Sequence, residues 1–583
     1  MKKTNKNKAS KIKRHEKTSR SSLTPLNSLP NRFVQGEICF SKNLMVKPTS
    51  SNLGSNIKSA FTELEKGNPQ RAFDICRGLL ASNPQNSQAL NIAGLASFRV
   101  GLLDDAIDLL QTAIFYSPDF VEVQINLGNI YSYLERFEEA SESYQQAIEI
   151  DANNISAFYN YGILLNRIEN YEEAIKAFEE VIDLDKNDFL AWHSLGNTYR
   201  SLERFEDANR AYEIALNLNP MSAESWVNLG AVLNELGDFK GAILRLQKAL
   251  EIDSHLTIAK YNLAIAFQER NKFKKANKLY EEILNSDPQN AAAAMNLAFS
   301  LQKMGNPKDA LTAFERVIEI DPNFSKAYVN LADVKLELGD PLGALSVCDG
   351  FLSQHPSNPD LLAFKTIVLR ELGENKKAKK LMNFERFLHI SKLKIPNGYG
   401  SAFNFNKVLK KHIKSHPTLT KSPQSHATRE GFHSGELLTD SNGPIRELEK
   451  ALRLHYDNYL ASLDVDDHPF LRSVPKKIKL SIWGVVMEEN GFQLPHLHPS
   501  SWLSGVYYVQ TAKSIQGQSR KSGWIAFGSP PKHFNCNHKF KSKYVEPYEG
   551  LLLLFPSFFY HHTIPAVGDG ERISIAFDFI RTD

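Results

Sequence analysis

The chain has 583 residues, of which 42% are hydrophobic, 23% charged and 10% aromatic, and its formal net charge is +3. This composition excludes a disordered protein, and the length exceeds what one hydrophobic core normally organises. The four cysteines have no regular spacing, which argues against a disulfide framework and favours a reducing compartment. No apolar stretch approaches the roughly 20 residues of a membrane span, and none follows the N-terminus as a secretory signal would require. The sequence therefore predicts a cytoplasmic protein of several domains.

Residues 1–52 are predicted to form a basic, disordered tail. Residues 1–32 carry ten lysines and arginines against Glu16 alone, a net charge of +9. Such a run is usually solvated, although it can also contact RNA or an anionic lipid surface. No aromatic side chains interleave with the charges, as base stacking would require. We therefore expect nucleic-acid contact to be limited to weak binding by this tail, and no membrane association.

Residues 53–392 repeat with a fixed period of 34 residues, which predicts ten helix pairs. A small residue, alanine or glycine with the single exception of Thr366, also stands twelve residues before the repeated alanine. Small side chains at both positions let paired helices pack closely. The repeated alanines are Ala72, Ala106, Ala140, Ala174, Ala208, Ala242, Ala276, Ala310, Ala344 and Ala378.

The segment "AFYNYGILLNRIENYEEAIKAFEEVIDLDKN" at residues 157–187 resembles the tetratricopeptide repeat (TPR) family. The resemblance extends over about 340 residues of the sequence. It implies an all-helical, right-handed superhelical solenoid whose concave surface binds protein or peptide partners. By itself it implies no chemistry.

Asparagines recur at one position of the repeats, and Ser194 takes the one missing place. An amide can both donate and accept a hydrogen bond, so such a ladder can pair with the main chain of a bound peptide. Alternatively, asparagine at this position serves neighbouring turns of the solenoid, and the sequence leaves both readings open. The candidate peptide-binding residues are Asn126, Asn160, Asn228, Asn262, Asn296 and Asn330.

The repeat register ends after Lys392, and residues 393–475 are predicted to contain two helices, at 405–413 and 445–463, with an irregular loop between them. From residue 476 to 583 the chain is rich in short segments of β-branched and aromatic residues separated by Gly, Pro and Ser. An antiparallel β-sandwich or barrel is therefore expected. The predicted strands are 478–487, 503–510, 523–528, 550–557 and 572–580.

Three histidines in this region form a metal-ligand pattern. His496 and His498 stand two residues apart, so their side chains can point to the same side of an extended segment. His561 follows at a distance, and Arg572 comes eleven residues later. Neutral imidazole is a suitable ligand for Fe, Zn, Ni and Cu. Although a lone histidine is usually a core or surface residue, three with an arginine in this order favour metal binding.

Three segments, "HLHPSSWLSGVYYV", "EGLLLLFPSFFYHH" and "ERISIAF", together resemble the iron(II)- and 2-oxoglutarate-dependent oxygenases, specifically a bacterial and phage subfamily with an HxHP core. The resemblance, over about residues 395–583, implies a double-stranded β-helix of the jelly-roll or cupin type. It implies that His496, His498 and His561 bind Fe(II). It further implies that Arg572 and Ser574 hold the distal carboxylate of 2-oxoglutarate.

His498 stands where the wider superfamily has aspartate. A neutral ligand in place of an anion leaves the site more positive, which puts catalysis in question more than the fold. His562 is an alternative to His561, but the spacing to Arg572 favours His561, and its neighbour is then expected to line the substrate pocket. The segment "HFNCNHK" at 533–539 offers one cysteine and two histidines, a weak zinc pattern, and is interpreted as a lid or substrate-facing loop.

Two functions are compatible with this sequence. In the first, the chain is a dioxygenase that uses Fe(II) and 2-oxoglutarate to hydroxylate a protein or peptide presented by the solenoid. In the second, the solenoid is a scaffold or adaptor and the barrel is a binding module without catalysis. No nucleotide-binding fingerprint or nucleophile elbow is present.

Overall fold

A computed structural model of the 583-residue chain describes residues 54–438, 443–511, 521–538, 540–566 and 570–582. The predicted basic tail, residues 1–52, lies outside the described residues. Ten consecutive helix pairs follow one another from Ser55 to Leu381, as the repeat period predicts. The twenty helices are α1 Ser55–Glu65, α2 Pro69–Ser82, α3 Ser87–Arg99, α4 Leu103–Tyr116, α5 Val121–Tyr133, α6 Phe137–Ile150, α7 Ile155–Arg167, α8 Tyr171–Leu184, α9 Phe189–Ser201, α10 Phe205–Leu218, α11 Ala223–Glu235, α12 Phe239–Ile252, α13 Thr257–Glu269, α14 Phe273–Ser286, α15 Ala291–Lys303, α16 Pro307–Ile320, α17 Ser325–Glu337, α18 Pro341–Gln354, α19 Pro359–Glu371 and α20 Asn375–Leu381.

The repeated small residues lie where the two helices of each pair touch. All ten repeated alanines, from Ala72 to Ala378, have a solvent exposure of 0%. The glycines at the second small position face a large side chain on the partner helix: a Cβ atom added to Gly128 would lie 2.7 Å from the ring of Tyr144. A larger residue at either position would therefore push the helices apart.

Gly230 and Gly350 provide a matched test of this packing, because both are helical glycines. A Cβ atom on Gly230 would overlap the side chain of Leu246, whereas nothing lies within 4 Å of the corresponding position on the exposed Gly350. We expect Gly230→Ala to destabilise the chain by about 1–3 kcal/mol through overpacking. Gly350→Ala should stabilise it by about 0.5–1 kcal/mol through helix propensity. Thermal unfolding of the full chain measures both; equal midpoints for the two variants would contradict close packing at Gly230.

The C-terminal domain is built on two antiparallel sheets, which confirms the predicted arrangement of a helical solenoid followed by a β domain. The larger sheet has the order β1-β8-β5-β10-β4-β3-β2 and the smaller one β7-β6-β9. The strands are β1 His389–Lys392, β2 Thr420–Lys421, β3 Thr428–His433, β4 Ile478–Gln493, β5 Leu503–Gln510, β6 Ile525–Phe527, β7 Lys543–Val545, β8 Leu551–Pro556, β9 His561–Thr563 and β10 Arg572–Arg581. The helices of this domain are α21 Phe384–Phe387, α22 Ala402–Lys414, α23 Pro444–Ala461 and α24 Pro469–Arg472.

A short strand lies just before the predicted domain boundary at residue 392. β1, inside the predicted repeat region, pairs with β8 of the β domain. The loop between α22 and α23 was expected to be irregular, but it contains β2 and β3, and β3 pairs with β4. The loop's glycines and prolines indicate turns, yet β2 pairs with β3 inside the loop, and β3 pairs with the more distant β4.

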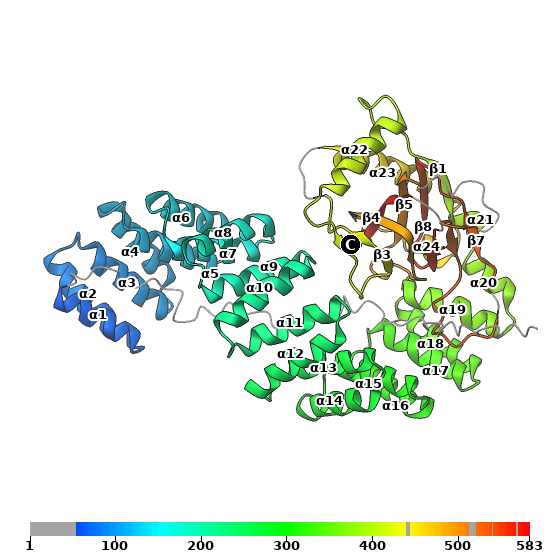
Figure 1. Ribbon diagram of the computed structural model, residues 1–583, viewed down its shortest axis with the longest axis horizontal. Coiled ribbons are helices and arrows are strands. Elements are labelled where there is room, and N and C mark those ends of the chain that lie inside the picture. Colours follow the sequence, from blue (N-terminus) through cyan, green and yellow to red (C-terminus); the bar gives the residue numbers. More distant parts are fainter. Residues whose placement is uncertain (1–53, 439–442, 512–520, 539, 567–569, 583) are drawn as a thin grey trace, which may run out of the picture.

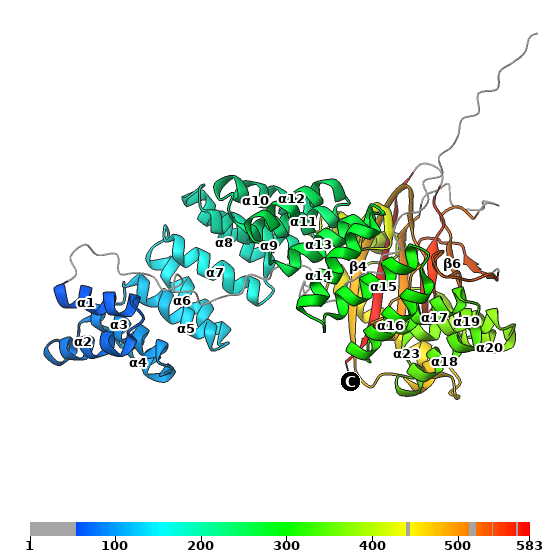
Figure 2. The same cartoon turned by 90° about the horizontal axis from the view of Figure 1, so that it is seen from below.

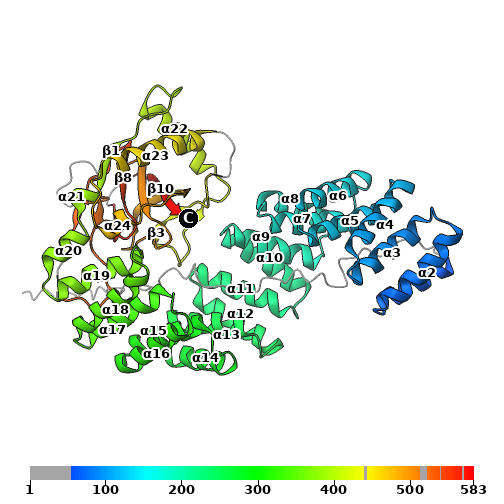
Figure 3. The same cartoon turned by 180° about the vertical axis from the view of Figure 1, so that it is seen from behind.

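The last repeats and the β domain share one hydrophobic core, which runs from Val329 in α17 to Phe579 in β10. Figure 1 shows α11–α20 curving beneath the β domain, while α1–α8 extend away from it. The views from below and from behind agree with this arrangement (Figures 2 and 3). The inner side of the last repeats is thereby turned towards the sheets.

A loop of the β domain, residues 529–538, also docks on the solenoid. The backbone N–H and the side-chain amide of Asn535 donate to Asp333 of α17, at 2.7 and 2.9 Å. Phe534 packs against Phe364 of α19 with ring centroids 5.0 Å apart. Burial raises the pKa of Asp333 to about 6, although the hydrogen bonds from Asn535 and Gln302 oppose that rise. The loop thus joins the two domains through buried polar and aromatic contacts.

None of the helices in the described ranges is both long enough and apolar enough to cross a membrane.

Candidate metal centre and cosubstrate site

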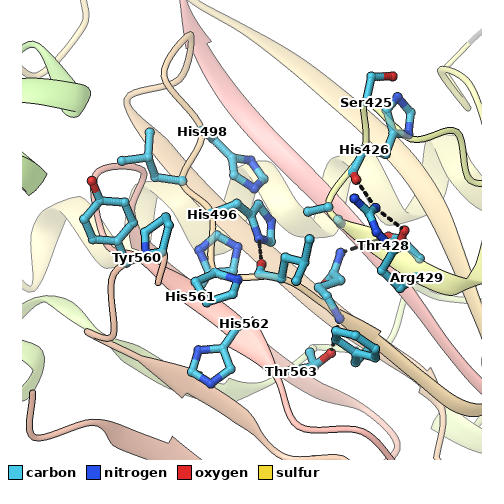
Figure 4. A pocket seen from close by; sticks show the side chains of 18 of the residues that line it. Ser425, His426, Thr428, Arg429, His496, His498, Tyr560, His561, His562 and Thr563 are labelled. Carbon is cyan, nitrogen blue, oxygen red and sulfur yellow. Dashed lines mark hydrogen bonds between the residues drawn. The ribbon is translucent and has the colours of Figure 1, made fainter. Parts of the chain in front are cut away.

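The three predicted ligand histidines converge at one point between the sheets. His496 and His498 lie in the segment that connects β4 to β5, and His561 begins β9. The backbones of His496 and His561 form a bridge in which each N–H donates to the other's carbonyl, at 3.0 and 2.9 Å. One potential ligand atom from each of the three residues lies within 4.8 Å of the other two. Figure 4 shows the three rings gathered together, while His562 points away from them.

Hydrogen bonds at Nδ1 orient all three rings. His496 donates to the carbonyl of Leu494 at 2.7 Å, and His561 donates to that of Phe559 at 3.0 Å. Since Nδ1 carries the proton, Nε2 keeps a free lone pair for a metal. Burial, with the neighbouring His498, lowers the pKa of His496 to about 3, and the same causes lower that of His561. Both rings are therefore neutral at pH 7, which is the form that binds metal ions.

The third ring, His498, is held by a buried carboxylate that the sequence analysis missed. Nδ1 of His498 lies 2.8 and 2.9 Å from the two carboxylate oxygens of Asp578 in β10. The hydroxyl of Ser504 donates to the same carboxylate at 2.6 Å. Burial alone would raise the pKa of Asp578, but His498 and these hydrogen bonds lower it below its usual range. Asp578 is thus a buried anion behind a ligand histidine, an arrangement that increases ligand basicity.

This carboxylate changes the interpretation of His498. The sequence predicts a more positive site, because histidine replaces the usual aspartate ligand. The structure instead places Asp578 directly behind His498, so a negative charge is still present one residue further from the metal position. The sequence of β10 could have predicted Asp578, because every second residue of a strand lies on the same face. Arg572, Ser574, Ala576 and Asp578 follow this spacing and all line the same cavity.

Arg572 offers a buried cationic position in the same cavity. Its side chain is 2% exposed and donates to the carbonyl of Gly523 at 2.7 Å and to the hydroxyl of Thr563 at 3.1 Å, with Met487 also in contact. No carboxylate of the described residues forms an ion pair with it. A buried guanidinium without an anionic partner is a suitable site for a carboxylate ligand. Burial lowers the pKa of Arg572, but guanidinium groups stay protonated in proteins.

These residues fit the groups that the sequence resemblance implies. Three imidazoles whose Nε2 atoms face one point form a donor set suited to iron(II), and they leave coordination positions for small molecules. Arg572 and Ser574 lie on the same face of β10, both lining the cavity, where they can hold a carboxylate. Tyr508 lines it as well, and burial raises its pKa to about 12, so it remains a neutral hydroxyl donor. The sequence analysis did not single out Tyr508.

His561 and His562 are adjacent in the sequence, but only His561 belongs to the three-histidine group, so the two residues allow a matched comparison. His562 lines the cavity but is not part of the three-histidine group. We expect His561→Ala to lose bound iron by a factor of about 10–100, and His562→Ala to retain it. Metal analysis of the purified variants after desalting gives the result. Equal iron loss in both, or none in either, would contradict the assignment of His561.

The six candidate asparagines lie in the interior of the solenoid. All are buried, with exposures of 8% or less. Asn126 donates to Asn91, Asn228 to Asn197 and Asn296 to Tyr261, each on a preceding helix, while Asn262 and Asn330 donate to backbone carbonyls of their own helices. Only Asn330 of the six lines the large cavity. These contacts favour the alternative in which the amides serve the solenoid itself.

The segment "HFNCNHK" does not form a metal group within the described residues. Its backbone instead meets the solenoid: the N–H groups of Asn537 and His538 donate to Glu371, at 2.8 and 3.1 Å. His533 lines the large cavity. The interpretation as a loop facing that cavity is therefore compatible with the structure.

The comparisons with known proteins identify both parts of the chain. Residues 481–578 match the family described as "Putative 2OG-Fe(II) oxygenase", and this range contains all three histidines, Arg572 and Asp578. Tetratricopeptide repeat families match residues 62–119, 128–168, 155–188, 193–256, 233–298 and 267–333. None of the curated proteins compared with the chain matches it.

Several solved structures of TPR proteins are similar to part of the chain. The TPR protein YrrB, described as having an unusual peptide-binding site, is 24% identical over 32% of this chain and 96% of its own, with a TM-score of 0.30. A TPR protein from Cytophaga hutchinsonii is 18% identical over 41% and 97%, with a TM-score of 0.36. One from Parabacteroides merdae is 17% identical over 43% and 98%, also with a TM-score of 0.36.

Proposed function

We propose that this chain, in which tetratricopeptide repeats precede a 2OG-Fe(II) oxygenase domain, is an iron(II)- and 2-oxoglutarate-dependent dioxygenase that hydroxylates a protein or peptide held by its solenoid. The three histidines bind the iron, and Arg572 with Ser574 binds the distal carboxylate of 2-oxoglutarate. We place it in the cytoplasm, in keeping with the free thiols of Cys76, Cys348 and Cys536.

One observation supports the proposal that the solenoid presents a polypeptide to the β domain: a single cavity of about 1470 Å³ is lined by both domains. On the barrel side it includes the three histidines and Arg572. On the solenoid side it includes Glu203 from the turn between α9 and α10 and residues from the helices α13 to α19 and their turns, namely Gln268, Glu269, Asn271, Phe273, Phe299, Lys303, Lys326, Val329, Asn330 and Asp360. A polypeptide bound against these helices can therefore reach the histidines without leaving the cavity.

The residues of the chain position the reactants. Asp578 fixes the ring of His498, and the Leu494 and Phe559 carbonyls fix those of His496 and His561. The aromatic rings of Phe555 and Phe527, centred 4.8 and 6.1 Å from the His561 ring, shield that side of the centre from water. When bound, iron(II) supplies the activation of dioxygen, by which 2-oxoglutarate becomes succinate and carbon dioxide and a substrate C–H bond is hydroxylated.

Isotopically labelled dioxygen tests this function directly. The purified full-length chain would be incubated with iron(II), 2-oxoglutarate and an extract containing both proteins and small molecules, with Arg572→Ala as the inactive control. We expect label in the polypeptide fraction that depends on the wild-type chain. Label confined to small molecules would contradict polypeptide presentation. Absence of label, with metal and 2-oxoglutarate bound, would favour the scaffold function.

A further inference from the structure

A second cluster of metal-ligating side chains lies between the solenoid and the β domain. It consists of Glu203, in the turn between α9 and α10, His426, in the loop before β3, and His433, at the end of β3. One potential ligand atom of each lies within 4.8 Å of the other two. None of these residues belongs to the three-histidine centre, and the sequence analysis did not single them out. Figure 4 places His426 across the pocket from that centre.

The spacing of this cluster matches that of metal ligands. Nε2 of His426 lies 3.4 Å from a carboxylate oxygen of Glu203, and the His426 and His433 ring centroids are 4.6 Å apart. Two ligands at about 2.0–2.1 Å from a tetrahedral ion are about 3.3–3.4 Å from each other. Two imidazoles and one carboxylate form a ligand set used by zinc and by iron(II), and they leave a position for water.

Unused nitrogen atoms distinguish the cluster from a simple ion pair. An ion pair between Glu203 and His426 accounts for one imidazole nitrogen, Nε2 of His426. The Nδ1 atoms of both His426 and His433 are buried and have no hydrogen-bond partner among the described residues. Leaving a buried polar atom unpaired costs free energy, and a cation held by Glu203, Nε2 of His426 and Nδ1 of His433 would remove that cost at His433.

Glu203 occupies a turn position whose backbone favours glycine. Glu203 has φ of 57°, in the left-handed region, and six of the ten repeats place glycine at the corresponding turn position. Glutamate at such a position is strained, and Glu135 also occupies it, with φ of 59°. Glu169 occupies the same position one repeat earlier, with φ of 60°, and does not line the large cavity. It is therefore a matched control.

The position of the cluster also suggests what a bound ion does. The hydroxyl of Thr420 donates to the carbonyl of Glu203 at 3.2 Å, and the N–H of Gln424 donates to the carbonyl of Glu235 at 2.9 Å. These contacts already hold the loop before β3 against the ends of α9 and α11. A metal ion shared by Glu203 and the two histidines would add a stronger link at the same place, fixing one wall of the large cavity.

We propose that Glu203, His426 and His433 bind a divalent transition-metal ion, distinct from the ion of the oxygenase centre, that fastens the solenoid to the β domain. This site does not depend on the proposed oxygenase activity. Its occupant is a zinc-like ion held by two imidazoles and one carboxylate, with water at the remaining position.

Metal stoichiometry tests the proposal. The full-length chain would be stripped with a chelator, titrated with Co²⁺ as a spectroscopic probe and desalted before metal analysis. We expect about two equivalents for the wild type and about one for the double variant His426→Ala/His433→Ala. Glu203→Gly should weaken Co²⁺ binding at this site by about 10-fold or more, while Glu169→Gly retains both ions. Because glycine relieves the left-handed turn, Glu203→Gly should remain folded, which circular dichroism checks.

The background variant His561→Ala separates the two sites. In that variant we expect one Co²⁺ to remain, with visible absorption that disappears when Glu203→Gly is added. If the three-histidine centre held no Co²⁺, the wild type would bind one ion and Glu203→Gly would still weaken it, so the proposal does not depend on the other site. Wild-type stoichiometry in the double variant, or equal affinities of Glu203→Gly and Glu169→Gly, would overturn it.

Discussion

Asp578→Asn is expected to lower the affinity for iron(II) by about 10–100-fold, since partners of ligand histidines have effects of this size. The Asp578 carboxylate accepts a hydrogen bond from Nδ1–H of His498 and places a buried negative charge directly behind that ligand. Asparagine has nearly the same shape but no charge. Iron titration of the chelator-stripped full-length chain, in a background that carries His426→Ala/His433→Ala, measures the oxygenase centre alone.

A smaller change at the same place separates charge from geometry. Ser504→Ala removes the hydroxyl that donates to Asp578 but leaves the carboxylate and its contact with His498 in place. We expect it to weaken iron binding less than Asp578→Asn does. Equal iron affinity in the wild type and in Asp578→Asn would show that the charge behind His498 does not matter. Iron binding would then depend on the three histidines alone.

Arg572→Ala should weaken 2-oxoglutarate binding by about 10–100-fold or more, which corresponds to the loss of about 1.5–3 kcal/mol for a charge-assisted hydrogen bond. Metal binding should remain, because Arg572 contacts Gly523, Thr563 and Met487 and none of the ligand histidines. Arg572→Lys is expected to fall between, since lysine keeps the charge but loses the planar, two-pronged geometry. Calorimetric titration of the metal-loaded chain with 2-oxoglutarate measures this series.

Arg581 is a suitable control, because it lies at the exposed end of the same strand, β10, and does not line the cavity. Arg581→Ala should bind 2-oxoglutarate as the wild type does. If Arg572→Ala and Arg581→Ala both retained wild-type affinity, the buried guanidinium would not be the carboxylate site. Loss of iron in Arg572→Ala would instead indicate that the arginine supports the metal centre.

The repeats were predictable because their information is local and periodic. The alanines from Ala72 to Ala378 recur every 34 residues, and each is buried where two neighbouring helices meet. The same reasoning located α22 and α23 and the longer strands β4, β5, β8 and β10. It did not find the short strands β1, β2, β3, β7 and β9, because two to six residues carry too little pattern; β1 in addition pairs with β8, far along the chain.

The candidate site was predictable only in part for the same reason. His496 and His498 stand two residues apart, so their spacing alone indicates a shared site. Asp578 is 80 residues from His498, and the two side chains meet only in the folded domain. Glu203 is separated still further from His426 and His433, and nothing in its own repeat marks it except glutamate where glycine is common. The asparagines show the opposite difficulty: a residue that recurs from repeat to repeat can serve a ligand or the repeat itself, and the sequence does not separate the two.

Succinate formation by the purified full-length chain, supplied with iron(II), 2-oxoglutarate and oxygen, is the most direct measure of catalysis at the three-histidine centre. We expect succinate in the wild type that depends on iron(II), and none above background in His561→Ala or Arg572→Ala. A wild-type chain that binds iron and 2-oxoglutarate but forms no succinate, with or without added polypeptide, would contradict the oxygenase function.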